Sequence, residues 1–186
     1  MIYRHQQLHT GGALFLDRDG VLNRLIVGDY VRTPDQLEVL PGVPEAIAIC
    51  NRHFKHVFIV TNQQCIGKGY ITVNQLESIH RKLIDAIEAA GGHIDHIYFC
   101  PDLASSYSPN RKPEIGMALQ ARHDYPDVIF MHSIMAGDSM TDMRFGHRCG
   151  MQTVLIGSDS NAVIGSPKLV NFSFPTLLQF AKSLEQ

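Results

Sequence analysis

The 186-residue sequence has no tryptophan, few cysteines, no long hydrophobic run and no excess of positive charge. The four cysteines form no CxxC pair, so the sequence predicts neither a disulfide framework nor a local zinc site; they are Cys50, Cys65, Cys100 and Cys149. The ten histidines are scattered and include no HExxH or HxH arrangement. Apolar runs such as 57–60 are too short to cross a bilayer, and the first residues lack the apolar core of a secretion signal. We therefore expect a cytoplasmic protein with no membrane partner.

Composition and charge are those of an ordinary globular domain. Hydrophobic residues make up 45% of the chain, and its length fits one domain with a substantial core, residues 1–186. Sixteen basic and eighteen acidic residues give a formal charge of −2, so nucleic acid is not expected as a partner. We expect a monomer or small homo-oligomer.

Short apolar segments alternate with segments of helical period along the chain. Buried strands are predicted at 13–16, 57–60, 94–99, 133–136 and 153–156, with a small edge strand at 171–172. Helices are predicted at 43–52, 73–90, 115–123, 143–149 and 176–184. This alternation is typical of an α/β fold in which a parallel sheet lies between two layers of helices. We predict a three-layer, doubly wound, Rossmann-like sheet.

Polar residues follow the predicted strands at the places where such sheets bind ligands. The segment 17–20 (DRDG) follows the first strand, 61–63 (TNQ) the second and 137–138 (GD) the fourth, while 111–113 (RKP) lies in the loop after the third. Ligands of open parallel sheets bind beyond the carboxyl ends of the strands. We expect these segments to meet at one edge of the sheet.

The residue types at this edge fit phosphoryl transfer. Asp17 and Asp138 would bring together two negative charges, which repel by roughly 4 kcal/mol at ~4 Å and an effective dielectric of about 20. A phosphate group would add to that charge, and oxygen donors with room for phosphate and water suit Mg²⁺. Asp17 could then attack phosphorus, and Asp19 could protonate the leaving oxygen. Thr61 and Lys112 would hold the phosphoryl oxygens.

Each motif is ordinary by itself. A lone DxD is more often a solvated turn, Thr-Asn is often a turn or helix cap, and the acidic pair Asp138 and Asp142 can be a helix start. Asp142 either has only that role or orients Lys112, and the sequence leaves both open. The ordered conjunction of all the motifs after predicted strands favours an enzyme.

These residues resemble the four motifs of the haloacid dehalogenase (HAD) superfamily of phosphatases. The segments are 15–23 (FLDRDGVLN), 60–62 (VTN), 112–113 (KP) and 137–142 (GDSMTD), and together they span nearly the whole chain. The resemblance implies Asp17 as nucleophile, Asp19 as general acid and base, and Thr61 and Lys112 as phosphate clamps. It also implies Mg²⁺ held by the carboxylates of Asp17 and Asp138 and by the backbone carbonyl of Asp19.

Closer features are similar to the histidinol-phosphatase and D,D-heptose-1,7-bisphosphate-phosphatase group (HAD subfamily IIIA). They include the DRDG segment, 28–31 (GDYV), 61–63 with 67–69 (GKG), and the Arg-Lys pair at 111–112. The resemblance implies a set of substrate-binding residues: Arg18, Tyr30, Asn62, Gln63, Gln64, Arg111 and Ser139. A guanidinium at Arg111 suits a second phosphate or a sugar hydroxyl.

The chain departs from this group at three places. Only Cys100 and Pro101 remain of the zinc loop that many relatives carry, so no zinc is expected. Ser139 stands where the heptose enzymes usually have lysine. Gln64-Cys65 stands where relatives often have Ser-Gly, and Cys65 is predicted to be a neutral filler. The motif intervals hold a helix and a strand each, so we expect a capless HAD fold with an open site or one completed by a neighbouring subunit.

We therefore expect a Mg²⁺-dependent phosphomonoester hydrolase acting on a small phosphorylated metabolite. D-glycero-D-manno-heptose 1,7-bisphosphate or a related sugar phosphate is the first expectation and histidinol phosphate the second. A polynucleotide 3′-phosphatase would carry a basic, aromatic-rich stretch, which is lacking here. A receiver-like signalling domain would have its phosphate-accepting aspartate after a central strand rather than in an Asp-x-Asp after the first. An inactive binding protein is disfavoured because no expected catalytic group is missing.

Overall fold

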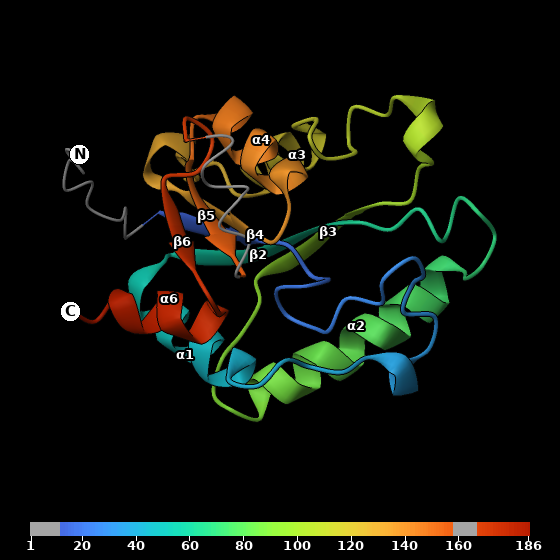
Figure 1. The fold of residues 1–186 in the computed structure, drawn as a ribbon, viewed down its shortest axis with the longest axis horizontal. Helices are drawn as coiled ribbons and strands as arrows, with labels where there is room; N and C mark the ends of the chain where they lie inside the picture. Colours follow the sequence, from blue (N-terminus) through green and yellow to red (C-terminus); the bar gives the residue numbers. More distant parts are fainter. Residues whose placement is uncertain (1–11, 158–166) are drawn as a thin grey trace.

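The computed structural model describes residues 12–157 and 167–186, which form one sheet with helices on both faces (Figure 1). The strands are β1 (Ala13–Leu16), β2 (His56–Asn62), β3 (His96–Cys100), β4 (Ile134–Gly137), β5 (Gln152–Ile156) and β6 (Phe172–Phe174). The α-helices are α1 (Val43–His53), α2 (Val73–Glu88), α3 (Gly116–Asp124), α4 (Met140–Cys149) and α6 (Leu177–Ser183). Three short 3₁₀ helices, η1 (Pro34–Gln36), η2 (Ala104–Ser106) and η3 (Phe130–His132), lie in the connections. None of the described helices is long and apolar enough to cross a bilayer.

All neighbouring strands of the sheet are parallel, in the order β3-β2-β1-β4-β5-β6. The order reverses direction at β1, which pairs with β2 on one side and with β4 on the other. Ligand sites of such sheets lie at this reversal, beyond the carboxyl ends of the strands. The predicted three-layer α/β class is confirmed.

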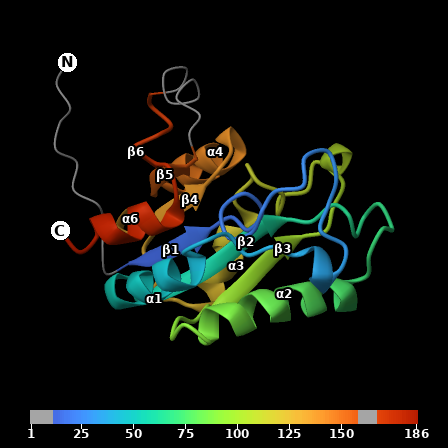
Figure 2. The same ribbon diagram turned by 60° about the horizontal axis from the view of Figure 1, so that its bottom comes forward.

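The two faces of the sheet bury separate halves of the core. Because side chains alternate along a strand, Leu14 and Leu16 of β1 pack in one cluster and Ala13 and Phe15 in the other. Helices α1, α2 and α6 cover the first face, and α3 and α4 cover the second (Figure 2). Because β1 is buried on both faces, its direction is fixed, and so is the position of Asp17 at its end.

The structure moves several predicted boundaries by one to three residues. Strand β2 runs to Asn62, so Thr61 and Asn62 are its last residues rather than the turn that follows it. Helix α4 begins at Met140 rather than 143, because Ser139 and Asp142 form a capping box at its start. Strand β3 begins two residues later than predicted and β6 one residue later, while α2 ends at Glu88.

Candidate active site

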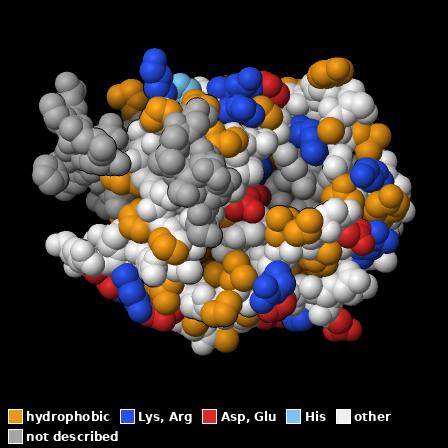
Figure 3. All heavy atoms as spheres, viewed as in Figure 1, with side chains coloured by type: hydrophobic (Ala, Val, Ile, Leu, Met, Phe, Trp, Pro, Cys, Tyr) orange, Lys and Arg blue, Asp and Glu red, His pale blue; other side chains and the backbone are white. Residues whose placement is uncertain are grey.

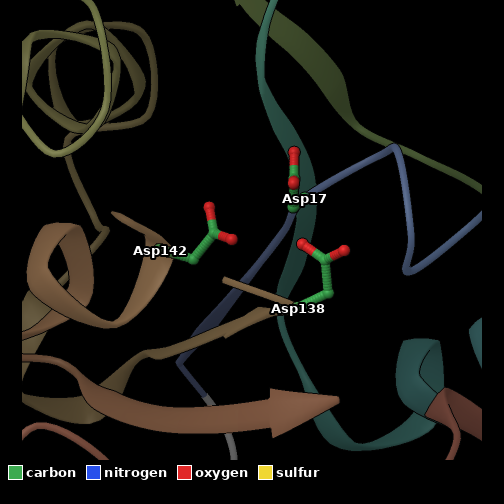
Figure 4. Close-up of side chains that lie close together, drawn as sticks. All are labelled: Asp17, Asp138 and Asp142. Atoms are coloured by element: carbon green, nitrogen blue, oxygen red, sulfur yellow. The ribbon is translucent and has the colours of Figure 1, made fainter. Parts of the chain in front are cut away.

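Three carboxylates converge at the reversal point of the sheet (Figure 4). Asp17 follows β1, Asp138 follows β4 and Asp142 lies in the first turn of α4. One oxygen of each lies within 4.8 Å of the others. The N–H of Asp17 donates to the carbonyl of Ala136 at 3.0 Å, which extends the β1–β4 pairing into the site. The parallel register therefore delivers Asp17 and Asp138 side by side.

Gly20 lets the loop after β1 pass close to Asp138. Its φ is +90°, and a Cβ atom there would lie 1.9 Å from Oδ2 of Asp138. Glycine adopts this left-handed conformation without the cost that other residues incur. Any side chain at position 20 would displace the Asp138 carboxylate.

Lys112 is the ammonium group of the cluster. Its Nζ lies 2.8 Å from Oδ1 of Asp17 and 2.6 Å from Oδ1 of Asp142. The loop that carries Lys112 is held to β2 by Asn62, whose side chain donates to the Lys112 carbonyl at 3.1 Å and accepts from its N–H at 3.0 Å. Burial alone would lower the pKa of Lys112, but Asp142 and Asp17 raise it above its usual value. Lys112 is therefore positively charged.

One ammonium does not balance three carboxylates. Burial, together with the charge of Asp142, raises the pKa of Asp17 to about 7 although Lys112 opposes the shift. Burial and Asp142 likewise raise the pKa of Asp138 to about 6. Burial is the larger cause of both shifts, and the charge of Asp142 adds to it, so the ionised carboxylates would be stabilised by a cation. The donors are all oxygens, which is the ligand type of Mg²⁺, so the cluster fits that ion.

Asp142 has both of the roles that the sequence left open. Its Oδ2 accepts from the Ser139 hydroxyl at 2.6 Å and from the Ser139 N–H at 3.2 Å, which caps α4. Its other oxygen faces Lys112, and only 1% of its side chain is exposed. Asp142 thus ties the position of the ammonium to the start of a helix.

Asp19 is held by side chains on three sides. Nη2 of Arg18 lies 2.9 and 2.8 Å from its two oxygens, Nδ2 of Asn23 donates at 2.9 Å, and Nε2 of Gln63 donates at 3.0 Å. Burial would raise the pKa of Asp19, but Arg18, Asn23 and Gln63 together lower it below its usual value. Gln63 also donates to the Thr61 hydroxyl at 2.8 Å, which joins two predicted catalytic residues. The carboxylate of Asp19 is therefore ionised and oriented.

A cavity of about 280 Å³ opens above these groups. On the face drawn in Figure 3, acidic side chains lie near the middle, with basic and hydrophobic side chains around them. The residues that line the cavity are Asp17, Asp19, Leu25, Ile26, Asp29, Tyr30, Val31, Thr61, Asn62, Lys112, Asp138, Ser139, Thr141 and Asp142. The predicted catalytic and metal-binding residues thus share one cavity.

The predicted substrate-binding residues divide into two groups. Tyr30, Asn62 and Ser139 line this cavity, and Arg111 lines an adjoining cavity of about 350 Å³ that shares Asn62, Lys112 and Thr141 with it. The side chains of Arg18, Gln63 and Gln64 are not part of either lining. Arg18 and Gln63 point to Asp19 instead, so a substrate contact of Arg18 would have to come from its main chain.

Two loops meet at the rim through the hydroxyl of Tyr30. Gln64 donates to this oxygen at 2.8 Å and Lys68 at 3.0 Å. Nζ of Lys68 also lies 5.1 Å from the centre of the Tyr30 ring, within the range of a cation–π contact. The loop 21–33 is therefore fastened to the loop after β2.

Sequence reasoning assigned no role to several residues of the site. Asn23 belongs to the first motif, and Lys68 lies in the Gly-Lys-Gly segment, so both had a local signal. Val31 belongs to the 28–31 segment and also had a signal, whereas the apolar lining residues Leu25 and Ile26 had none, because they lie in a loop without period. His80, which contacts Arg18, lies on the buried face of α2 and was given no role from the sequence.

Comparisons with known proteins agree with this geometry. Residues 109–167 match a family model described as HAD-hydrolase-like. D-glycero-alpha-D-manno-heptose-1,7-bisphosphate 7-phosphatase of Mycobacterium tuberculosis (strain ATCC 25618 / H37Rv) is 36% identical over 168 residues, which are 90% of this chain and 88% of the relative. This chain belongs to the HAD-like phosphatases. A second relative, D-glycero-D-manno-heptose-1,7-bisphosphate 7-phosphatase of Thermosynechococcus vestitus, is 31% identical over 77% of this chain and 78% of its own.

This HAD-like phosphatase is similar in structure to a relative that was crystallised with a metal ion. D,D-heptose 1,7-bisphosphate phosphatase of B. bronchiseptica, crystallised with magnesium and phosphate, aligns with a TM-score of 0.84 and 28% identity. The alignment covers 94% of this chain and 98% of the neighbour. The predicted resemblance and enzyme class are confirmed, whereas the role of each site residue remains a prediction.

Proposed function

We propose that this phosphatase hydrolyses a sugar phosphate, D-glycero-D-manno-heptose 1,7-bisphosphate or a close relative, through a phospho-aspartate on Asp17. The observation that carries the proposal is the contact of Lys112 with Asp17 at the floor of a cavity that also holds Asp138. A carboxylate that faces an open cavity beside a fixed cation is placed to attack a bound phosphate. The names of the relatives supply the substrate class.

In the first step an oxygen of Asp17 forms a bond to phosphorus while the bond from phosphorus to the sugar oxygen breaks. Asp19, which is ionised in the free enzyme and takes up a proton from solvent when the substrate binds, gives that proton to the leaving oxygen, and Lys112 and Thr61 hold the oxygens of the transferring group. In the second step Asp19 takes a proton from water, the water oxygen attacks phosphorus, and Asp17 is released as a carboxylate with free phosphate. When bound by Asp17, Asp138 and the Asp19 carbonyl, Mg²⁺ would neutralise phosphate charge.

The second cavity supports a substrate with two phosphates. Arg111 lines it, and the cavity continues from the first through Asn62, Lys112 and Thr141. A guanidinium there can bind a second phosphate through two hydrogen bonds. We also propose that the enzyme acts in the cytoplasm, as a monomer or small homo-oligomer, and without zinc.

A panel of phosphate esters tests this proposal. Purified protein with Mg²⁺ is expected to release phosphate from heptose 1,7-bisphosphate faster than from the 1-phosphate, histidinol phosphate or a 3′-phosphorylated oligonucleotide. The Asp17→Asn variant should be folded, by circular dichroism, and inactive. No release from any ester, or equal release in EDTA, would contradict the proposal. A faster reaction with histidinol phosphate or the oligonucleotide would replace the substrate and keep the chemistry.

A further inference from the structure

Arg18 is enclosed between the catalytic loop and helix α2. Only 1% of it is exposed, although its guanidinium is always charged. Its Nη2 contacts both oxygens of Asp19, and its Nη1 lies 3.1 Å from Nε2 of His80. Its Nε is buried and has no hydrogen-bond partner among the described residues. The orientation of this guanidinium therefore depends on Asp19 and His80.

His80 must accept the hydrogen bond from Arg18, because a guanidinium can only donate. The ring is therefore neutral, with its proton on Nδ1. Burial and the neighbouring charge of Arg18 agree with this state, since they lower the pKa of His80 to about 3. The ring packs edge-on against Phe99, with centroids 6.3 Å apart. The imidazole is held by its apolar surroundings and presents one nitrogen to Arg18.

His80 is the polar member of an otherwise apolar face. The other buried residues of α2 are Leu76, Ile79, Leu83 and Ile87. A histidine costs more to bury there than a leucine unless its polar atoms are paired. The contact with Arg18 provides such a pairing and links α2 to the loop after β1.

We infer that His80 is a positioning residue for the carboxylate of Asp19 and acts through Arg18. The inference rests on the proposed role of Asp19 as general acid and base. The guanidinium is planar and rigid, so a contact that fixes Nη1 also fixes the direction of Nη2. Without His80, Arg18 would keep only its bond to Asp19, and the two groups would turn together. Asn23 and Gln63 also hold Asp19, so loss of His80 is expected to weaken the step rather than abolish it.

Two variants and two esters test the inference. His80→Leu removes the acceptor, whereas His80→Gln keeps one, because its Oε1 can take the place of Nε2. An alkyl phosphate needs a proton on its leaving oxygen, and 4-nitrophenyl phosphate does not. We expect His80→Leu to lower kcat/KM by ~10-fold for the alkyl ester and by less than ~3-fold for the aryl ester, a fraction of the ~10²- to 10⁴-fold effect of a general acid. His80→Gln should restore most of the loss.

Asp19→Asn provides the positive control. We expect it to lower kcat/KM more than His80→Leu does, and again more for the alkyl ester than for the aryl ester. The inference would be overturned if His80→Leu lowered kcat/KM equally for both esters, or if His80→Gln were no more active than His80→Leu. His80 would then be a packing residue. If Asp19→Asn shows the expected pattern and His80→Leu does not, the inference fails while the proposed function stands. If the wild-type protein hydrolyses neither ester, both fail.

A measurement on the wild-type protein needs no variant. Histidine ¹⁵N NMR is expected to show His80 with a proton on Nδ1 and none on Nε2 at neutral pH. A proton on Nε2 would overturn the inference, because Arg18 cannot accept it. This result also decides the matter if His80→Leu does not fold.

Discussion

The ammonium of Lys112 lies 2.6 Å from Asp142, and 2% and 1% of the two side chains are exposed. Lys112 is the cation that separates Asp142 from Asp17 in the absence of a metal. Lys112→Met should therefore destabilise the metal-free protein by ~3 kcal/mol, because it leaves buried carboxylates uncompensated. Thermal unfolding should show a midpoint lower by ~6–12 °C.

A matched control is Lys182→Met, which removes an ammonium from an exposed ion pair with Glu45 at 3.1 Å. Exposed pairs contribute ~0–1 kcal/mol, so this variant should unfold within a few degrees of the wild type. Equal effects of the two substitutions would contradict the importance of the buried Lys112 cluster.

Magnesium and protons should compete for the carboxylates. The pKa values of about 7 for Asp17 and about 6 for Asp138 lie above those of the unfolded chain, so the metal-free fold binds extra protons between about pH 4 and pH 7. Its stability falls as pH rises through this window. At pH 8 both groups are ionised and free to bind a cation, whereas at pH 5 both are protonated.

Differential scanning fluorimetry checks this competition. At a Mg²⁺ concentration ~100 times Kd, binding adds ~2.7 kcal/mol, which is a rise of ~5–10 °C in Tm at pH 8. The rise should be much smaller at pH 5 and should vanish in Asp138→Asn. A rise of the same size at both pH values would show that Mg²⁺ binds elsewhere.

Gly20→Ala should abolish the Mg²⁺-dependent rise in Tm, because the new Cβ would lie 1.9 Å from the Asp138 carboxylate. Gly28→Ala is the control. Gly28 has a similar φ of +75°, but no atom lies within 4 Å of the added Cβ. Both variants incur the backbone cost of ~1–2 kcal/mol, and only the first should lose the response to metal.

The Tyr30 hydroxyl fastens two loops at the rim, so Tyr30→Phe should raise KM by ~3- to 10-fold with kcat within ~2-fold. This rise corresponds to ~0.7–1.4 kcal/mol, the typical net contribution of one hydrogen bond, and the hydroxyl accepts from Gln64 and Lys68. Tyr125→Phe removes a hydroxyl that donates to the Asp95 carbonyl at 3.1 Å and should leave KM unchanged. A fall in kcat without a change in KM would contradict a role in binding.

Buried His80 should make the protein sensitive to acid. Its pKa of about 3 lies below that of the unfolded chain, so the unfolded state takes up a proton between about pH 6.5 and pH 3 and the folded state does not. Stability is therefore lost as pH falls through this window. Between pH 6.5 and pH 5, urea unfolding should show the wild type losing ~1.6 kcal/mol more than His80→Gln.

The strands and the residues that follow them could be predicted because both depend on local signals. Four-residue apolar runs such as β1 predict buried strands, and the parallel-sheet rule then brings Asp17 and Asp138 to one edge. The structure confirms this convergence. The start of α4 was predicted three residues late: the acidic pair Asp138 and Asp142 was noted as a possible helix start, but the capping box of Ser139 and Asp142 was not predicted.

Side-chain direction could not be predicted in the same way. The family resemblance implied a substrate contact for Arg18, but its side chain contacts Asp19 and His80, the latter on a helix 62 residues away. Periodicity places His80 on the buried face of α2 and cannot show what it meets there. Such contacts depend on how α2 packs on the sheet, which is a tertiary property.

The pairing of β1 with β4 has a consequence for biosynthesis. Leu14 pairs with Ile134, which lies 120 positions further along the chain. A nascent chain that lacks β4 has Asp17 but not Asp138, Asp142 or the strand that positions them. The carboxylate cluster of Asp17, Asp138 and Asp142 is therefore complete only after about three-quarters of the polypeptide has left the ribosome.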